Sequence, residues 1–363
     1  MRGAFKIGTL AGIEVFVHWS FGLLLLYVAF SAFKDGAATA EILFSLALVL
    51  AIFGCVTLHE LGHALAARRY GIKTRDIILL PIGGVARLES MPVNPRQEII
   101  VAVAGPLVNV VIALAIQIVF VIATGKLLWQ MAEIGDITLQ TFLLSLAVSN
   151  LMLVAFNAIP AFPMDGGRVL RATLSFFMPR PKATNIAAAI GRLFAMAFAL
   201  FGIYIGHYWL LLTALFVYWA ASSEANMVEQ KARMDGLKVR NAMRNKFSPL
   251  FLGHSLQEAI DELLAGADTD FVVCNSQLIA VGLLNRRDII RAMSDGYDKN
   301  ASIEPYVRTN VPVLMPEHPL HDVYTMMQEN GYNLLPVSEG GHLVGVIDLD
   351  NIAEFLLLRE AAQ

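Results

Sequence analysis

Long apolar segments constrain the fold of this chain more than any other feature of its sequence. An α-helix needs about 20 apolar residues to cross the hydrocarbon core of a bilayer. Six segments approach that length, namely Val15–Phe33, Ile42–Ala67, Ile99–Ala123, Leu139–Ala158, Ile186–Ile205 and Tyr208–Ala221. The sequence therefore predicts a multi-pass, all-α membrane domain with about six transmembrane helices over residues 1–221.

The density and the sign of the charge change at about residue 221. Residues 1–221 contain 15 Lys and Arg and 10 Asp and Glu, a net charge of +5, whereas residues 222–363 contain 12 and 20, a net charge of −8. The whole chain is 56% apolar and only 16% charged, a composition that excludes a disordered chain, a single soluble domain and a protein that binds nucleic acid through a basic surface. Cys55 and Cys274 lie one in each part, so they cannot form a disulfide framework, which fits a reducing compartment.

The basic residues of the first part also predict its orientation. Cytoplasmic connections of membrane proteins carry an excess of Lys and Arg. One alternate set of connections holds only Lys34 and Lys126, whereas the other holds Arg2, Lys6, Arg68, Arg69, Lys73, Arg75, Arg87, Arg96, Arg168, Arg171, Arg180 and Lys182. With six spans, this pattern predicts a multi-pass protein of the cell (inner or plasma) membrane with both termini in the cytoplasm. No small-residue cleavage site follows the first apolar segment, so we expect that segment to be retained.

The motif His59-Glu60-Leu61-Gly62-His63 lies near the end of the second apolar segment. On a helix, positions i and i+4 share one face, so both imidazoles can reach one zinc ion with Glu60 beside it. Each uncompensated ionisable side chain in a membrane helix costs about 2.5–3.5 kcal/mol, and a divalent cation would compensate them. The alternative is a helix end at which these side chains meet water, since Arg68 and Arg69 follow closely.

A catalytic zinc site needs three protein ligands and an open position, so a third ligand must come from elsewhere. The best candidate is Asp165, in the segment Asn157–Arg168, where Pro160 and Pro163 break the fourth apolar segment. Broken backbone at membrane depth is tolerated only where it is buried in protein or lines a wet cavity. The alternative is a loop outside the bilayer with Asp165 in water.

These motifs resemble those of the site-2 protease family of intramembrane zinc metalloproteases, over essentially residues 8–221. The sequence HELGH is followed about a hundred residues later by NxxPxxPxDGG, and Gly105–Asn109 (GPLVN) and Gly83–Arg87 (GGVAR) also match. Met164 stands where family members often have leucine. The resemblance implies that the zinc ligands are His59, His63 and Asp165, that Glu60 is the catalytic glutamate, and that Asn157 positions the substrate or the oxyanion.

An α-helical substrate must unwind before its peptide bonds can be attacked. The segment Ile77–Glu89 is apolar and β-prone around Gly83-Gly84, so it is a candidate sheet edge for an extended substrate strand. An ordinary hairpin at the membrane interface is the alternative.

The last third of the chain contains an internal repeat with a period near 64 residues. Leu256–Ile260 corresponds to Leu320–Tyr324, and Gly282–Ile289 corresponds to Gly345–Ile352. Each unit is predicted to contain a helix, two strands and a second helix, in that order. Residues 222–238 are expected to form a linker or a helix that runs out of the membrane. The units that follow resemble a tandem cystathionine-β-synthase (CBS) domain pair, a cytoplasmic α/β module with repeats at 239–300 and 301–363.

Such CBS pairs often bind an adenine nucleotide through a Ser or Thr and an Asp three residues later. The equivalent positions here are Asn285 and Asp288 in the first repeat, and Asp348 and Asn351 in the second. Only Asp288 has the usual type, so it is the candidate nucleotide-binding residue, with dimerisation or substrate gating as the alternative role of the module.

Taken together, these features predict an intramembrane zinc endopeptidase that cleaves transmembrane segments of membrane-anchored proteins, such as an anti-sigma factor or another tethered regulator. The CBS pair would modulate it and could form a homodimer, and no nucleic acid is expected as a partner. A CBS-gated transporter or channel is a second hypothesis, but it predicts charges along a path through the bundle. An inactive scaffold is a third, and the intact His59, Glu60, His63 and Asp165 argue against it.

Overall fold

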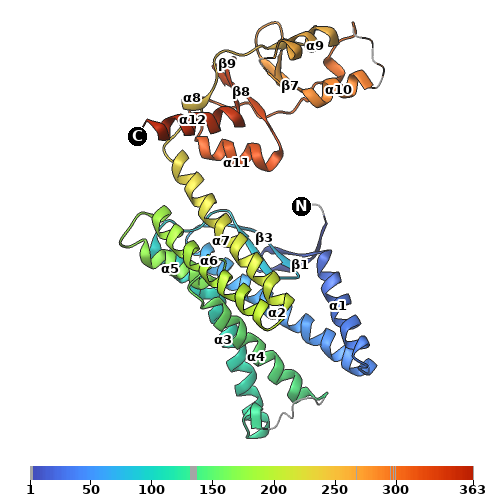
Figure 1. Ribbon diagram of the computed structural model, residues 1–363, viewed down its shortest axis with the longest axis vertical. Helices are drawn as coiled ribbons and strands as arrows, with labels where there is room; N and C mark the ends of the chain where they lie inside the picture. The colour runs from blue at the N-terminus through green and yellow to red at the C-terminus, as the bar shows by residue number, and fades with distance from the viewer. Residues whose placement is uncertain are drawn as a thin grey trace. The chain divides into compact units, whose positions relative to one another are not determined.

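The computed structural model describes residues 3–130, 137–266, 268–294, 296, 298 and 300–362, and its chain divides into two compact units, Met1–Val228 and Glu229–Gln363 (Figure 1). Arg2, one of the basic residues used above to predict orientation, lies outside the described residues. The elements that begin in unit 1 are β1 (Ala4–Leu10), β2 (Ile13–His18), α1 (Ser20–Lys34), α2 (Thr39–Arg68), β3 (Thr74–Leu80), β4 (Gly83–Leu88), α3 (Pro95–Thr124), η1 (Leu128–Gln130), α4 (Leu139–Asn157), α5 (Asp165–Leu174), α6 (Arg180–Tyr204) and α7 (Tyr208–Met234).

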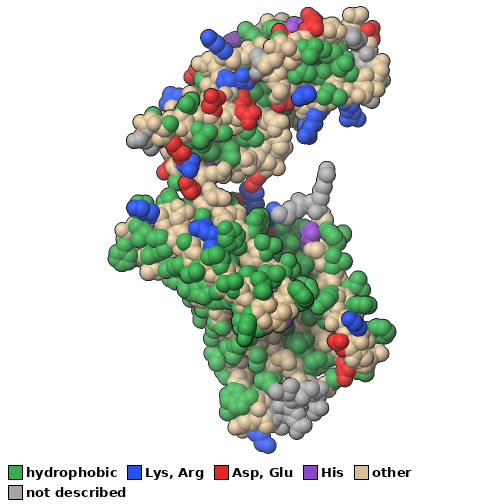
Figure 2. Space-filling view, in the orientation of Figure 1, with side chains coloured by type: hydrophobic (Ala, Val, Ile, Leu, Met, Phe, Trp, Pro, Cys, Tyr) green, Lys and Arg blue, Asp and Glu red, His purple; other side chains and the backbone are tan. Residues whose placement is uncertain are grey.

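Within the described residues, four helices are long and apolar enough to cross a membrane: α2, α3, α4 and α6. Large hydrophobic side chains remain exposed along them, and Figure 2 shows such side chains over most of the visible face of unit 1. The predicted count of six is not confirmed. α1 has only 15 residues, and α7 continues from its apolar half into a polar half that ends at Met234.

The prediction of an all-α first domain is wrong, because unit 1 also contains a four-stranded sheet in the order β1-β2-β3-β4. The predicted first span began at Val15, but residues 13–18 form β2, in which Ile13 and Val15 are buried while Glu14 is exposed. This alternation has the period of a strand rather than of a helix. Ala11 and Gly12 connect β1 to β2 with positive φ at both residues, as a two-residue hairpin turn requires.

The sheet brings distant parts of unit 1 together. β1 pairs with β2 and β3 with β4 in antiparallel hairpins, and β2 pairs in parallel with β3 across the intervening α1 and α2. β4 is left as an edge strand, and it contacts α2. The sheet therefore lies beside the helix that carries the HELGH motif.

Unit 2 contains two similar α/β repeats. Its elements are α8 (Val239–Ala242), β5 (Leu250–Phe251), α9 (Leu256–Ala265), β6 (Asp270–Cys274), β7 (Ala280–Asn285), α10 (Arg286–Ser294), η2 (Glu304–Tyr306), α11 (Leu320–Asn330), β8 (Leu334–Glu339), β9 (His342–Asp348) and α12 (Leu349–Ala361). Each repeat supplies an antiparallel strand pair, β6–β7 or β8–β9. One buried cluster combines residues of both repeats, including Cys274 and Leu335. Burial raises the pKa of the Cys274 thiol, so this cysteine is held in its protonated form.

Candidate metal centre

Two histidines and one aspartate meet inside unit 1. His59 and His63 lie one turn apart on α2, and Asp165 is the first residue of α5. Asp165 Oδ2 lies 3.2 Å from His59 Nε2 and 3.1 Å from His63 Nε2, and the two Nε2 atoms are 3.1 Å apart. All three side chains are buried, and among the described residues they form a group that could hold a metal ion.

Glycines let the broken segment fold back under the first turn of α5. A Cβ added at Gly166 would lie 2.3 Å from the carbonyl oxygen of Ile159, and one at Gly167 would lie 2.5 Å from the carbonyl carbon of Ala161. Contacts this short exclude any side chain at the two positions. The sequence Asp-Gly-Gly therefore places the carboxylate of Asp165 at a helix start packed closely against its own preceding loop.

α3 contacts both histidines. The carbonyl oxygen of Val101 accepts a hydrogen bond from His63 Nδ1 at 2.7 Å, which leaves the Nε2 lone pair of His63 directed at the cluster. A Cβ at Gly105 would lie 2.2 Å from His63 Nε2 and 2.8 Å from His59 Nε2. The glycine of the GPLVN motif thus allows α3 to approach both histidines closely, a role that the sequence alone did not reveal.

The donor set fits zinc. Two imidazole nitrogens and one carboxylate are common zinc ligands, and three protein ligands leave the fourth position that a catalytic site needs. Burial alone would raise the pKa of Asp165, but the neighbouring His63, His59 and Arg168 hold it well below its ordinary value, so the carboxylate is ionised. The oxygen that faces the histidines is Oδ2, and the second oxygen, Oδ1, lies 3.6 Å from Arg168 Nη1.

Glu60 is half-buried next to this cluster and is held by the sheet. Its Oε2 accepts a hydrogen bond from the backbone N–H of Ala86 in β4 at 2.9 Å. A Cβ at Gly84 would lie 2.7 Å from Glu60 Cγ, so the glycine allows β4 to approach the glutamate. The outward edge of β4 therefore faces the side chain that the sequence predicts to be catalytic.

The structure does not bring Asn157 into the same set of contacts. Asn157 is the last residue of α4, and its Nδ2 donates to the carbonyl oxygen of Leu153 on the same helix at 3.0 Å. Its position immediately before the broken segment agrees with the motif, but its described hydrogen bond serves the helix end.

The predicted nucleotide residues of unit 2 make local contacts. Asn285 Oδ1 accepts a hydrogen bond from Asp288 N, and Asp288 Oδ2 lies 3.1 Å from Arg308 Nε. Asp348 caps α12 through Asn351 N, and its Oδ2 lies 3.1 Å from Arg244 Nη2. In both repeats the aspartate therefore forms an ion pair with an arginine of the other repeat.

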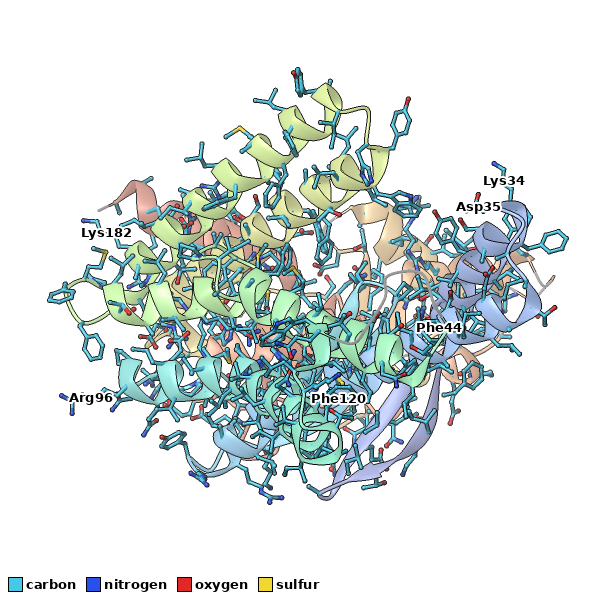
Figure 3. All side chains as sticks on the ribbon, turned by 90° about the horizontal axis from the view of Figure 1, so that it is seen from below. Lys34, Asp35, Phe44, Arg96, Phe120 and Lys182 are labelled. Carbon is cyan, nitrogen blue, oxygen red and sulfur yellow. The ribbon has the colours of Figure 1, made fainter. Side chains whose placement is uncertain are left out.

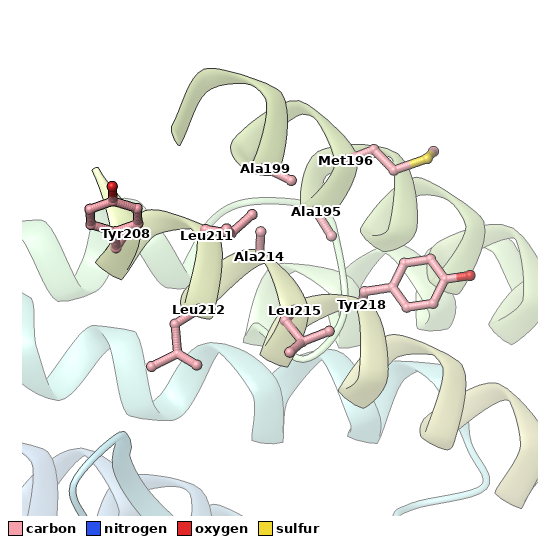
Figure 4. Close-up of a pocket in the computed structure, with 9 residues that line it drawn as sticks. All are labelled: Ala195, Met196, Ala199, Tyr208, Leu211, Leu212, Ala214, Leu215 and Tyr218. Carbon is pink, nitrogen blue, oxygen red and sulfur yellow. The ribbon is translucent and has the colours of Figure 1, made fainter. Parts of the chain in front are cut away.

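An apolar pocket of about 440 Å³ lies between α6 and α7 (Figure 4). Its lining includes Ala195, Met196, Tyr208 and Leu215 but none of the three clustered residues. The described residues that line it include no His, Cys, Asp or Glu, so it is distinct from the candidate centre.

Comparisons with known proteins agree with the geometry. The model of peptidase family M50 matches residues 47–133 and 120–198, and the CBS domain model matches residues 303–358. A zinc metalloprotease of Methanocaldococcus jannaschii is 32% identical over 365 residues, which cover 99% of this chain and 98% of that protein. Stage IV sporulation protein FB of Bacillus subtilis is 31% identical over 139 residues, 38% of this chain and 44% of that protein. A solved site-2 protease from Methanocaldococcus jannaschii shares 37% identity, covers 61% of this chain and 95% of its own, and superimposes with a TM-score of 0.48.

Proposed function

Because the chain belongs to peptidase family M50, the site-2 proteases, and is a zinc metalloprotease with a CBS domain, we propose that it cleaves transmembrane segments of membrane-anchored proteins. One observation carries the proposal. The cluster of His59, His63 and Asp165 is buried against α2 and α3, two helices long enough to cross a membrane. A hydrolytic site at that place suits a peptide bond that also lies in or near the bilayer.

We infer that His59, His63 and Asp165 hold the zinc ion, through Nε2, Nε2 and Oδ2. When bound, zinc supplies a Lewis acid that polarises the scissile carbonyl and lowers the pKa of water. The protein fixes the ligands beforehand, since Val101 orients His63 and the folded-back loop orients Asp165.

Glu60 is proposed as the general base and then the general acid. Its Oε2 is engaged by Ala86 N, so Oε1 is the oxygen that takes the proton of the attacking water and returns it to the leaving nitrogen. Asn157 is proposed to hold the substrate or its carbonyl oxygen, which requires its Nδ2 to exchange Leu153 O for the substrate.

The edge of β4 is proposed to hold the unwound substrate as an added strand. β4 pairs on one side with β3, and on its other side Ala86 N reaches Glu60. An extended peptide laid along this side would pass the general base, and backbone hydrogen bonds would hold it without selecting its sequence.

We propose a multi-pass location in the cell membrane with both termini in the cytoplasm. Arg96, labelled in Figure 3, lies in the first turn of α3, and Lys126 lies just beyond the end of this helix of 30 residues, so α3 separates a basic residue of one set of connections from one of the other. This separation supports the orientation predicted from basic residues.

The CBS pair is proposed to modulate cleavage and to form a homodimer, and the substrates are proposed to be tethered regulators such as anti-sigma factors. Adenine-nucleotide binding at Asp288 stays a prediction. The ribose would have to replace Arg308 as the partner of this carboxylate.

The experiment that tests the proposal uses the full chain in lipid vesicles with a single-span substrate. Zinc content, cleavage rate and the position of the cut are measured for the parent protein, Glu60→Gln and the matched control Glu41→Gln, which changes an exposed glutamate in the first turn of α2. We expect Glu60→Gln to retain zinc and lose cleavage, and Glu41→Gln to retain both. Cleavage by Glu60→Gln at the parent rate would overturn the proposal, and zinc without cleavage in the parent would favour a scaffold.

A further inference from the structure

We propose that Arg171 is a positioning residue that sets Asp165 against His63, by clamping the helix of the third ligand to the helix behind the histidines. The inference rests on the proposed function, in which Asp165 and His63 are zinc ligands. It concerns a second buried cluster of unit 1, which the sequence did not predict.

The cluster consists of two arginines and two glutamates from four helices. Arg171 of α5 and Glu98 of α3 are each only 1% exposed, with Arg171 Nε 2.7 Å and Nη2 2.5 Å from Glu98 Oε1. Arg180 Nη2 of α6 lies 3.2 Å from Glu98 Oε2, and Arg171 also pairs with Glu224 of α7. The four formal charges cancel.

Arg171 holds both flanks of Asp165. It lies six residues after Asp165 on α5, a helix of 10 residues, and its guanidinium sits 5.0 Å from the centre of the Phe162 ring. Phe162 is three residues before Asp165, and its backbone is enclosed by Gly167 on one side and Gly191 on the other. A shift of the guanidinium would therefore move both the helix and the loop that meet at the carboxylate.

Glu98 connects the same guanidinium to the histidines. Glu98 lies in the first turn of α3, three residues before Val101, whose carbonyl oxygen holds His63 Nδ1. These contacts form a closed ring. It runs from Asp165 along α5 to Arg171, then through Glu98 and α3 to Val101 and His63, and His63 lies beside Asp165. A guanidinium can clamp in this way because its planar fork presents several N–H donors in fixed directions.

Stability alone does not account for this pair. Replacing a buried ion pair with apolar residues is often neutral or stabilising, because desolvating two charges cancels most of their attraction. The pair instead fixes how α3 and α5 lie against each other. This position matters at the metal ligands, because mutation of groups that hold metal ligands commonly changes metal affinity by about 10- to 100-fold.

The test compares Arg171→Lys and Arg171→Met in the full chain with the matched control Arg240→Met, which removes an exposed arginine in unit 2. Zinc affinity is measured by competition with a chelator, and the ligand geometry by the visible spectrum of the cobalt-substituted protein, on material that is folded by circular dichroism. We expect affinity to fall by about 10- to 100-fold in Arg171→Met and by less in Arg171→Lys. Both variants should have altered cobalt spectra, and the control should match the parent.

Two outcomes separate this inference from the proposed function. A parent that binds no zinc would defeat the proposed function and this inference with it. A parent that binds zinc, with Arg171→Lys showing the parental affinity and cobalt spectrum, would overturn the inference alone. The lysine variant keeps the buried charge, so it supplies the decisive measurement if Arg171→Met does not fold.

Discussion

Two buried polar clusters in unit 1 differ in whether their charges cancel, and this difference distinguishes a ligand-binding site from a structural support. In the cluster of Glu98, Arg171, Arg180 and Glu224, every carboxylate faces a guanidinium. In the cluster of His59, His63 and Asp165, three atoms with lone pairs converge within about the same distance. The first arrangement is electrically complete, whereas the second is stable only with a cation or protons at its centre. A convergent and incomplete cluster indicates ligand binding, and a complete one indicates architecture.

The two clusters also share their helices. α3 supplies Glu98 to one and Val101 and Gly105 to the other, and α5 supplies Arg171 to one and Asp165 to the other. The comparison therefore predicts that changes in the incomplete cluster abolish metal binding, while changes in the complete cluster act first on stability.

The largest effect is expected for Asp165→Asn. An amide is a weaker ligand than a carboxylate and carries no charge, so zinc affinity should fall by at least about 100-fold, more than for a change behind the ligands. Cleavage should fall below detection. Metal analysis of the purified variant checks this, with Asp35→Asn, an exposed carboxylate at the end of α1, as the control.

If Asp165→Asn contained as much zinc as the parent, the distinction between the two clusters would be contradicted, because the Asp165 carboxylate would then have only a structural role. In that case the resemblance of the motif to the protease family would have misled the assignment of the third ligand.

The next largest effect is expected for Glu98→Gln, and on stability. The change leaves Arg171 and Arg180 without the carboxylate that both contact, and breaking a buried pair costs about 3–5 kcal/mol. Unfolding by denaturant in detergent measures it. Glu41→Gln, in the exposed first turn of α2, is the control and should change stability by less than about 1 kcal/mol. Equal effects of the two changes would mean that the buried cluster is not a support.

These clusters also mark how far the sequence could predict the structure. His59, Glu60 and His63 are separated by less than two helical turns, so helix geometry alone brings them together. Asp165 lies 102 residues from His63, so it was indicated as the third ligand by the prolines and glycines around it and by the resemblance of the motifs to a known family, not by helix geometry. Arg171 was counted among the basic residues of cytoplasmic connections, but it is 1% exposed. Its partner Glu98 is 73 residues away, and no local pattern encodes that distance.

The β1–β2 hairpin of unit 1 was missed for a related reason, whereas the β-prone segment predicted at Ile77–Glu89 falls on β3 and β4. Between β2 and α1 the segment from Val15 to Phe33 is broken only by His18 and Ser20, so hydropathy averaged over a window shows one segment where there are two elements. Only the short alternation of buried Ile13, exposed Glu14 and buried Val15 distinguishes the strand. Three residues of alternation are too few to outweigh a long apolar run.

A smaller effect is expected for Gly105→Ala, which tests how tightly the incomplete cluster is held. The added Cβ would lie 2.2 Å from His63 Nε2, and His63 cannot rotate away freely because Val101 holds its Nδ1. We expect zinc affinity to fall by at least about 10- to 100-fold, because the added methyl group would crowd the two Nε2 atoms that face the metal.

Gly54→Ala on α2 provides the matched control, since nothing lies within 4 Å of its Cβ position. It should bind zinc as the parent does. If Gly105→Ala also bound zinc with the parental affinity, the imidazoles would have room to move, and the cluster would be looser than its contacts indicate.

The smallest effect is expected for Glu224→Gln, because this glutamate lies at the rim of the complete cluster. Its side chain is 33% exposed, compared with 1% for Glu98, and Arg171 keeps Glu98 when Glu224 loses its charge. A half-solvated pair contributes about 0–1 kcal/mol, so stability should change by no more than that and zinc affinity by less than about threefold. Glu354→Gln on the exposed face of α12 is the control, with the same unfolding and chelator measurements. A loss as large as that of Glu98→Gln would mean that α7 is part of the clamp.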